Sequence, residues 1–255
     1  MSKVYVLGDL HFSLGVDKPM DIFGKAWENH TERICENWRR IVSPDDCVVV
    51  NGDISWGLGL EEAVPDLILL DSLPGTKIIM KGNHELWWTT LAKLTNVLKE
   101  HDLKTIRPLY NNACFLPEND LLICGTRGWL APGDEEFKAQ DEKIWKRELM
   151  RFGLSLSCGR SLAEKAGRSQ EEYETVVFTH YPPFVFTKRE PTEFTEMIER
   201  SGASRCYFGH VHGMTMKHKG QEGIPPIYRS NGVQYYLTAA DYLNMEPALV
   251  CGDPD

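Results

Sequence analysis

The sequence predicts an α/β fold with two β-sheets, and three observations lead to this prediction. Short runs of β-branched and aromatic residues recur along the chain, and each ends in residues that can bind metal ions. These runs are Val4–His11, Cys47–Asp53, Lys77–Glu85, Thr175–His180 and Arg205–His212. Such near-continuous apolar runs are typical of strands in a sheet that is covered on both faces. Asp53 to Asn83 and His180 to His210 each span about 30 residues, the length of a strand–helix–strand unit.

The third observation is the long interval from Asn83 to His180. It spans nearly 100 residues, too many for one crossover, and it contains strand-like runs at 114–116 and 121–125. A second sheet is therefore expected to begin there. Near the C-terminus, Asn231-Gly232 separates two strand-like runs, which is a strong signal for a β-hairpin. We expect this hairpin to extend the second sheet.

Helices are expected between the strands, because apolar residues recur at three- and four-residue spacing. The segments 27–41 and 86–98 show this spacing, and 60–73 is also expected to be helical. Pro65 leaves the start of that third helix open, since proline is tolerated near a first turn. The mixed charges of 134–156 predict a solvated surface helix. Four tryptophans are expected to fill the core: Trp27, Trp38, Trp87 and Trp88.

Length and composition favour one globular domain over residues 1–255. Hydrophobic residues make up 42% and charged residues 25%, which excludes a disordered chain, a fibrous repeat and a disulfide-rich miniprotein. Lys and Arg number 28 against 37 Asp and Glu, a formal net charge of −9. That charge argues against coating of nucleic acid. A small phosphorylated substrate remains compatible, because a metal ion can supply positive charge locally.

The seven cysteines are widely spaced and contain no C-x-x-C pair, so we expect reduced thiols. Asp9 and His11 interrupt the first apolar run before it could serve as a signal peptide. Uncharged apolar runs such as CVVV are far shorter than the ~20 residues of a membrane helix. We therefore expect a cytoplasmic protein with no membrane partner. The sequence leaves its oligomeric state open.

The residues at the strand ends form a mixed nitrogen and oxygen donor set. Its members are Asp9, His11, Asp53, Asn83, His180, His210 and His212. Without a thiolate, such a set suits Mn, Fe or Zn. Seven donors are too many for one tetrahedral ion, whereas two ions roughly 3.5–4 Å apart would use them all. Asp53 suits the bridging position, since its two oxygens can each hold a different cation. Three other histidines, His30, His101 and His218, are assigned to the surface or the core.

In order along the chain, these motifs are D-x-H, GD, GNH followed by an acid, H, and GHxH. This order resembles the calcineurin-like metallophosphoesterases. The resemblance runs from residue 9 to 212 and implies a four-layer α/β/β/α sandwich of two mixed sheets. By that resemblance Asp9, His11, Asp53 and His212 would hold the first metal. Asp53, Asn83, His180 and His210 would hold the second. The family block commonly ends in aspartate, whereas Glu85 stands here, so the contact that orients His84 would be one methylene longer.

These residues predict hydrolysis of a phosphomonoester or phosphodiester. Two cations acidify a shared water, and the resulting bridging hydroxide attacks phosphorus in line. His84 is left over from the donor set, so we expect it to stabilise the transition state or to protonate the leaving oxygen. Two alternatives stay open: a non-catalytic protein-binding platform with this fold, and a mononuclear zinc hydrolase with three protein ligands.

Substrate contacts are the least determined part of the site. Arg127 and Trp129 follow a strand-like run, where they can contact a phosphate and a base or ring. An Arg–carboxylate pair and a packed tryptophan account for the same residues equally well. Tyr181, next to His180, is a further candidate to line the pocket.

Overall fold

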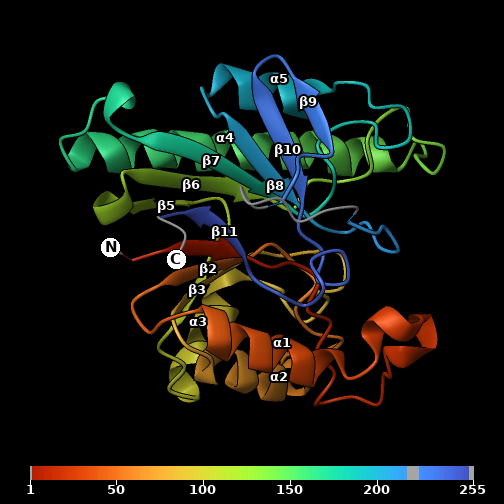
Figure 1. The fold of residues 1–255 in the computed structure, drawn as a ribbon. Coiled ribbons are helices and arrows are strands. Elements are labelled where there is room, and N and C mark those ends of the chain that lie inside the picture. The colour runs from red at the N-terminus through yellow and green to blue at the C-terminus, as the bar shows by residue number, and fades with distance from the viewer. Residues whose placement is uncertain (1, 217–223, 253–255) are drawn as a thin grey trace.

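Two β-sheets lie face to face between two layers of helices (Figure 1). The computed structural model describes residues 2–216 and 224–252. Helices α1 (His30–Ile41), α2 (Leu60–Ser72) and α3 (Leu91–Glu100) cover the first sheet, and α4 (Asp141–Lys165) and α5 (Glu193–Arg200) cover the second. The predicted α/β/β/α sandwich is confirmed. His218 lies outside the described residues.

The first sheet has the strand order β11-β1-β2-β3-β4. Its strands are β1 (Val4–Val6), β2 (Cys47–Val50), β3 (Thr76–Ile79), β4 (Ile106–Pro108) and β11 (Ala248–Cys251). β1 to β4 are parallel, and β11 pairs antiparallel with β1. The three predicted strands of this sheet are confirmed. All residues of β1 and β2 are buried, in keeping with a sheet covered on both faces.

The second sheet has the order β5-β6-β7-β8-β10-β9. Its strands are β5 (Ala113–Leu116), β6 (Leu121–Thr126), β7 (Glu174–Thr179), β8 (Arg205–Phe208), β9 (Tyr228–Ser230) and β10 (Val233–Leu237). The predicted hairpin joins β9 to β10, and both turn residues, Asn231 and Gly232, have positive φ, as a type I′ turn requires. It extends the second sheet as expected.

Helix boundaries differ from the sequence prediction where local capping decides them. The helix expected from 86 begins at Leu91, because the Thr90 side chain accepts a hydrogen bond from the Lys93 backbone at 3.2 Å and caps it. The helix expected from 27 begins at His30, after Asn29 with its left-handed φ of 50°. The four tryptophans are buried, as predicted.

Helix α4 also begins later than the 134–156 prediction and continues to Lys165. One of its faces is buried against the second sheet and includes Trp145 and Phe152, so it is not solvated all round. Gly159 allows its close approach, since a Cβ there would lie 2.8 Å from the Cys124 sulfur. Among the described residues, no helix combines the length and the hydropathy needed to cross a membrane.

The carboxyl ends of the central strands of both sheets meet at one edge of the sandwich, and Asn51 joins the sheets there. It directly follows β2 and donates hydrogen bonds to the Thr179 carbonyl and to the Thr238 hydroxyl of the second sheet, both at 3.0 Å. The loops after β1, β2, β3, β7 and β8 therefore converge, as expected for ligands at the carboxyl ends of parallel strands.

Candidate metal centre

Two groups of side chains at this edge can each hold a metal ion. We call Asp9, His11 and His212 the open group, and Asp53, His180 and His210 the enclosed group. Within each group, one ligand atom per residue lies within 4.8 Å of the others. Both groups combine residues from the first sheet with residues from the second, so each depends on the packing of the two sheets.

The loops that carry these side chains have an unusual backbone. Asp9, His11, Asp53 and His210 have φ values of 56°, 48°, 51° and 68°, in the left-handed region that costs a non-glycine residue about 1–2 kcal/mol. Backbone hydrogen bonds of 2.9 Å from Asp9 to Gly52 and from His11 to Asp53 hold the first loop in this form. Four of the candidate ligands thus sit on left-handed backbone, which aims their side chains at one place.

Two motif glycines are required by close approach. A Cβ at Gly82 would overlap the Asp53 carboxylate, and one at Gly209 would overlap the Asp9 carboxylate. The glycines of the GNH and GHxH motifs thus make room for the carboxylates beside them.

In the enclosed group, side-chain atoms converge as ligands around an ion do. The Asn83 Oδ1 lies 2.7 Å from His180 Nε2 and 2.8 Å from His210 Nδ1. His180 Nε2 lies 3.3 Å from Asp53 Oδ2. Ligand bonds of about 2.1 Å in an octahedral arrangement separate neighbouring ligand atoms by about 3.0 Å. These residues therefore fit a divalent cation.

In the open group, the Nε2 atoms of His11 and His212 face each other at 3.3 Å. Asp9 Oδ1 lies 3.7 Å from His212 Nε2. Two imidazole nitrogens pointing at each other need a proton or a cation between them, so this group also fits an ion. Asp53 Oδ2, 3.8 Å from His11 Nε2, lies near both groups.

Protons occupy part of this donor set when no cation is bound. Burial alone would lower the pKa of His180, but the carboxylates of Asp53 and Asp9 outweigh it and raise that pKa to about 9. Burial, with His180 nearby, lowers the pKa of His210 to about 3. Burial raises the pKa of Asp9 to about 6. A cation entering the enclosed group must therefore displace a proton from His180.

Further residues hold the candidate ligands in place, and the sequence motifs did not reveal them. His212 Nδ1 lies 3.0 Å from Asp241 Oδ1, and the same carboxylate accepts from the Gly213 backbone at 2.8 Å. His180 Nδ1 lies 3.1 Å from the Asn51 carbonyl. Such outer partners fix ring orientation at metal sites. Asp241 follows strand β10, so the rule of an acid after a strand would have found it.

His30 is another outer partner. Its buried imidazole lies 3.1 Å from the His11 carbonyl, so it supports the first loop from the core. His101 is exposed. Both positions agree with the assignment of these residues to the core or the surface.

His84 stands beside the two groups and belongs to neither of them. Its Nε2 lies 3.9 Å from Asp53 Oδ2, its side chain is 36% exposed, and its backbone donates to Asp53 Oδ1 at 2.9 Å. The ring packs against Trp56 with centroids 4.1 Å apart. It is therefore oriented by Trp56 and accessible from solvent.

Glu85 makes a different contact from the one expected. Within the described residues, its carboxylate accepts hydrogen bonds from backbone N–H groups alone: Gly82 at 2.5 Å, Asp53 at 3.0 Å and Ile54 at 2.6 Å. The expected orienting contact with the His84 imidazole is wrong, because the fully buried carboxylate is used to tie the loops after β2 and β3 together.

The three expected substrate residues lie near the centre but face different partners. Arg127 pairs with Glu148 at 3.3 Å and lies 4.5 Å from the Trp129 ring centroid. Trp129 donates to Asp141 at 2.9 Å. The sequence allowed two explanations of Arg127 and Trp129: substrate contacts, or an Arg–carboxylate pair with a packed tryptophan. The contacts in the structure match the second explanation. The Tyr181 ring lies 4.1 Å from the His210 ring, beside the enclosed group.

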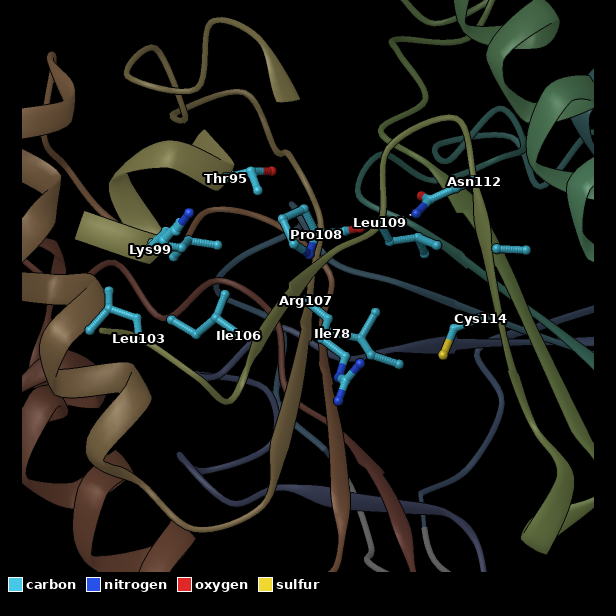
Figure 2. Close-up of a pocket in the computed structure, with 12 residues that line it drawn as sticks. Ile78, Thr95, Lys99, Leu103, Ile106, Arg107, Pro108, Leu109, Asn112 and Cys114 are labelled. Carbon is cyan, nitrogen blue, oxygen red and sulfur yellow. Dashed lines mark hydrogen bonds between the residues drawn. The ribbon is translucent and has the colours of Figure 1, made fainter. Parts of the chain in front are cut away.

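Two hollows differ in their relation to the centre. A pocket of about 340 Å³ is lined by Trp129, Tyr181 and His210, among others. Another hollow, of about 470 Å³, lies between α3 and strands β4 and β5, with Lys99 and Cys114 on opposite sides (Figure 2). None of the predicted site residues lines this second hollow.

A family model for calcineurin-like phosphoesterases matches residues 2–214. The chain belongs to this family. The resemblance drawn from the sequence motifs is thereby confirmed. The family is one of metal-dependent phosphohydrolases, and the chain carries two groups that can hold metal ions, so it is a metal-dependent phosphohydrolase.

Solved structures share the fold at low sequence identity. A phosphopantetheinyl hydrolase from Mycobacterium tuberculosis is 17% identical, with a TM-score of 0.56 over 99% of this chain and 97% of that chain. A protein from Thermus thermophilus is 12% identical, with a TM-score of 0.51 over 99% of both chains. A protein of unknown function from Aquifex aeolicus is 15% identical, with a TM-score of 0.50 over 98% and 96%. No curated protein matches the sequence.

Proposed function

We propose that this protein hydrolyses a small phosphomonoester or phosphodiester with two divalent ions, one in each group. The observation that carries the proposal is the position of Asp53, whose Oδ2 lies 3.3 Å from His180 Nε2 and 3.8 Å from His11 Nε2. One carboxylate is thus shared between the groups. Two divalent ions supply an activated water and positive charge for the phosphoryl oxygens. The donor set favours Mn, Fe or Zn.

Each remaining residue has a defined task in this proposal. Asn83 offers an uncharged oxygen between His180 and His210, which limits the negative charge of the enclosed group. His84, held by Trp56 and exposed to solvent, can reach a bound phosphoryl group. We assign it to stabilising charge in the transition state or to protonating the leaving oxygen.

The alternative functions are less well supported. A mononuclear zinc hydrolase would leave one of the two converged groups without an ion. A protein-binding platform would need neither the shared Asp53 nor the accessible His84. The choice of substrate, the physiological metal, the cytoplasmic location and the single domain over 1–255 remain predictions.

Metal content and turnover test the proposal together. The protein is stripped with a chelator, reloaded with Mn²⁺, and assayed on a panel of phosphomonoesters, phosphodiesters and nucleotides. We expect two ions per chain by elemental analysis, no turnover in the stripped protein, and recovery on reloading. One ion per chain at saturation would contradict the dinuclear proposal, and no turnover of the whole panel by fully loaded protein would contradict the enzyme assignment.

A further inference from the structure

The 340 Å³ pocket beside the enclosed group has walls of unusual composition. Three aromatic side chains and Val211 line it, together with two exposed carboxylates; its main residues are Trp129, Tyr181, Phe186, Val211, Glu135 and Glu136. His210 of the enclosed group lines the same pocket. A molecule in this pocket therefore lies directly against a candidate metal ligand.

Trp129 and Tyr181 of the aromatic wall are packed against their neighbours. Trp129 and Tyr181 pack with ring centroids 5.1 Å apart, and Tyr181 packs on His210 at 4.1 Å. Trp129 is further fixed by its hydrogen bond to Asp141 and by Arg127 over its ring. Fixed aromatic faces bind flat apolar groups at little entropic cost.

Tyr181 also offers an unused polar group. The residue is 5% exposed, and within residues 2–216 and 224–252 its hydroxyl makes no hydrogen bond with another side chain or with the backbone. A hydroxyl that no protein group engages at a pocket wall can exchange its water for a hydrogen-bonding atom of a ligand. The pocket is thus equipped for a group that has both an apolar face and a hydrogen-bonding atom.

The charge on the pocket is negative. Arg127 is paired with Glu148, and the Asp134 carboxylate accepts from the Ala131 backbone, whereas Glu135 and Glu136 are exposed at the wall. A second anionic group on a substrate would lie beside these two carboxylates. Repulsion from two exposed carboxylates a few ångström away weakens binding by about tenfold at low salt and by less when salt is added.

We propose that this pocket binds the organic group of the substrate and selects esters whose organic group is planar, apolar and free of further negative charge. The inference rests on the proposed phosphoesterase function and adds the substrate class to it. Because of its two exposed carboxylates, the pocket disfavours bisphosphates and polyphosphates. Trp129 and Tyr181 are then specificity residues, and Arg127 supports Trp129 instead of binding phosphate.

A matched set of esters tests the selection. The set consists of three esters that share an alkoxide leaving group and differ in the ring and its charge: ethyl phosphate, 2-phenylethyl phosphate and 2-(4-carboxyphenyl)ethyl phosphate. If the protein hydrolyses only diesters, the methyl diesters of the same alcohols take their place. With Mn²⁺-loaded protein, we expect kcat/KM for the phenylethyl ester to exceed that for the ethyl ester by about 10- to 100-fold. The carboxylated ester should be about tenfold poorer than the phenylethyl ester, with a gap that shrinks in added salt.

Variants of the pocket residues show whether the preference among these esters comes from the pocket or from changes in folding and net charge. Trp129→Ala should lower kcat/KM for the phenylethyl ester at least tenfold more than it lowers kcat/KM for the ethyl ester. Trp129→Phe should keep part of this preference, and it serves if the alanine variant folds poorly. The double variant Glu135→Gln with Glu136→Gln should reduce the difference in kcat/KM between the phenylethyl ester and the carboxylated ester. The control pair Glu100→Gln with Glu164→Gln makes the same change in net charge at exposed positions outside the pocket and should leave the gap unchanged.

Binding distinguishes failure of this inference from failure of the proposed function. 3-Phenylpropylphosphonate cannot be hydrolysed, and its affinity for the loaded protein is measured by calorimetry beside that of propylphosphonate. We expect the phenyl compound to bind at least tenfold more tightly, and Trp129→Ala to abolish the difference. The inference would be overturned if both compounds bound with equal affinity, or if Trp129→Ala lowered the affinity for both by the same factor, even if esters are hydrolysed. Absence of turnover with selective phosphonate binding would overturn only the enzyme assignment.

Discussion

The enclosed and open groups are built from the same kinds of side chain, but they are held in different ways. Asp53 and His180 of the enclosed group are 1% and 0% exposed, and Asn83 links its two histidines. In the open group the His212 side chain is 34% exposed and depends on a contact with Asp241. Two members of each group are buried between the sheets, but the open group is completed by an exposed histidine and the enclosed group by a half-buried one. We expect tighter binding and slower exchange of the ion in the enclosed group.

Asp53→Asn should have the largest effect, because Asp53 lies near both groups. An amide has no charge, so the repulsion between two cations roughly 3.5–4 Å apart would be compensated, among the candidate ligands, by the Asp9 carboxylate alone. We expect both ions to bind more than 100-fold more weakly and turnover to fall to background. Elemental analysis after gel filtration and steady-state assays measure this. The exposed Asp45→Asn serves as control, and two tightly held ions in Asp53→Asn would contradict the shared position.

His84→Ala should change turnover and spare both groups, since His84 belongs to neither. Loss of a general acid or of transition-state stabilisation typically lowers the rate by about 10²–10⁴-fold. Metal content and melting temperature should stay close to those of the unchanged protein. The loss should be largest for alkyl esters, because a poor leaving group needs a proton more. Loss of an ion, or full activity on an alkyl ester, would show that His84 has another role.

Asp241→Asn should affect the open group alone. The carboxylate orients His212 and accepts from the Gly213 backbone, so both hydrogen bonds support the loop that completes the open group. Changing such an outer partner typically weakens metal binding by about 10–100-fold. Metal titration should then show one weakened and one unchanged site. Equal weakening of both sites would remove the distinction between the groups.

The two groups should also differ in how pH changes ion binding. The pKa of about 9 at His180 means that a proton competes for the enclosed group throughout the neutral range. In the open group, burial raises the pKa of Asp9 to about 6; burial alone would lower the pKa of His212, but the contact with Asp241 raises that pKa above its usual value. Protons therefore compete for the open group up to near-neutral pH, and for the enclosed group up to about pH 9. The affinity of the enclosed group for a divalent ion should therefore rise by up to about tenfold per pH unit until pH 9. Calorimetry in buffers of different ionisation enthalpy measures the released proton, and pH-independent binding would contradict this.

The sequence predicted the strands that carry the site, because an apolar run that ends in metal-binding side chains is typical of a buried strand that leads into a site. It missed β4 and β11, which lie at the two edges of their sheet. It placed the start of α3 too early, because Trp87 and Trp88 continue the helical spacing while they lie buried in the preceding loop. A periodic pattern reports burial, whereas the capping contact of Thr90 decides where the helix begins.

The candidate ligands were all predictable from their positions after strands, and the structure brings them together. The roles of residues that act through a ligand were not predictable. Asp241 could have been found as an acid after a strand, but no spacing in the sequence connects Asp241 or Asn51 to the histidine that it contacts. Trp56 packs on His84 in the same way. Such contacts depend on how loops of the two sheets fold over each other, which local sequence does not encode.

Glu85→Gln tests how far the enclosed group depends on its loops, and it should have the smallest effect on turnover. The buried carboxylate accepts from the backbone of Gly82, Asp53 and Ile54, so an amide NH₂ in its place would face an N–H donor. Leaving a buried donor unpaired costs about 1–3 kcal/mol, and we expect that loss in the free energy of unfolding.

Because these contacts position Asp53 and Asn83, the ion in the enclosed group should bind more weakly in Glu85→Gln while the open group changes less. Chemical denaturation and metal titration of the same preparation measure both effects, with Glu100→Gln as the exposed control. The turnover of Glu85→Gln at saturating Mn²⁺ should remain well above that of His84→Ala, since the Glu85 carboxylate does not contact the His84 ring in the described residues. A loss of turnover as large as that of His84→Ala, with both ions bound and stability unchanged, would mean that Glu85 acts on His84 after all.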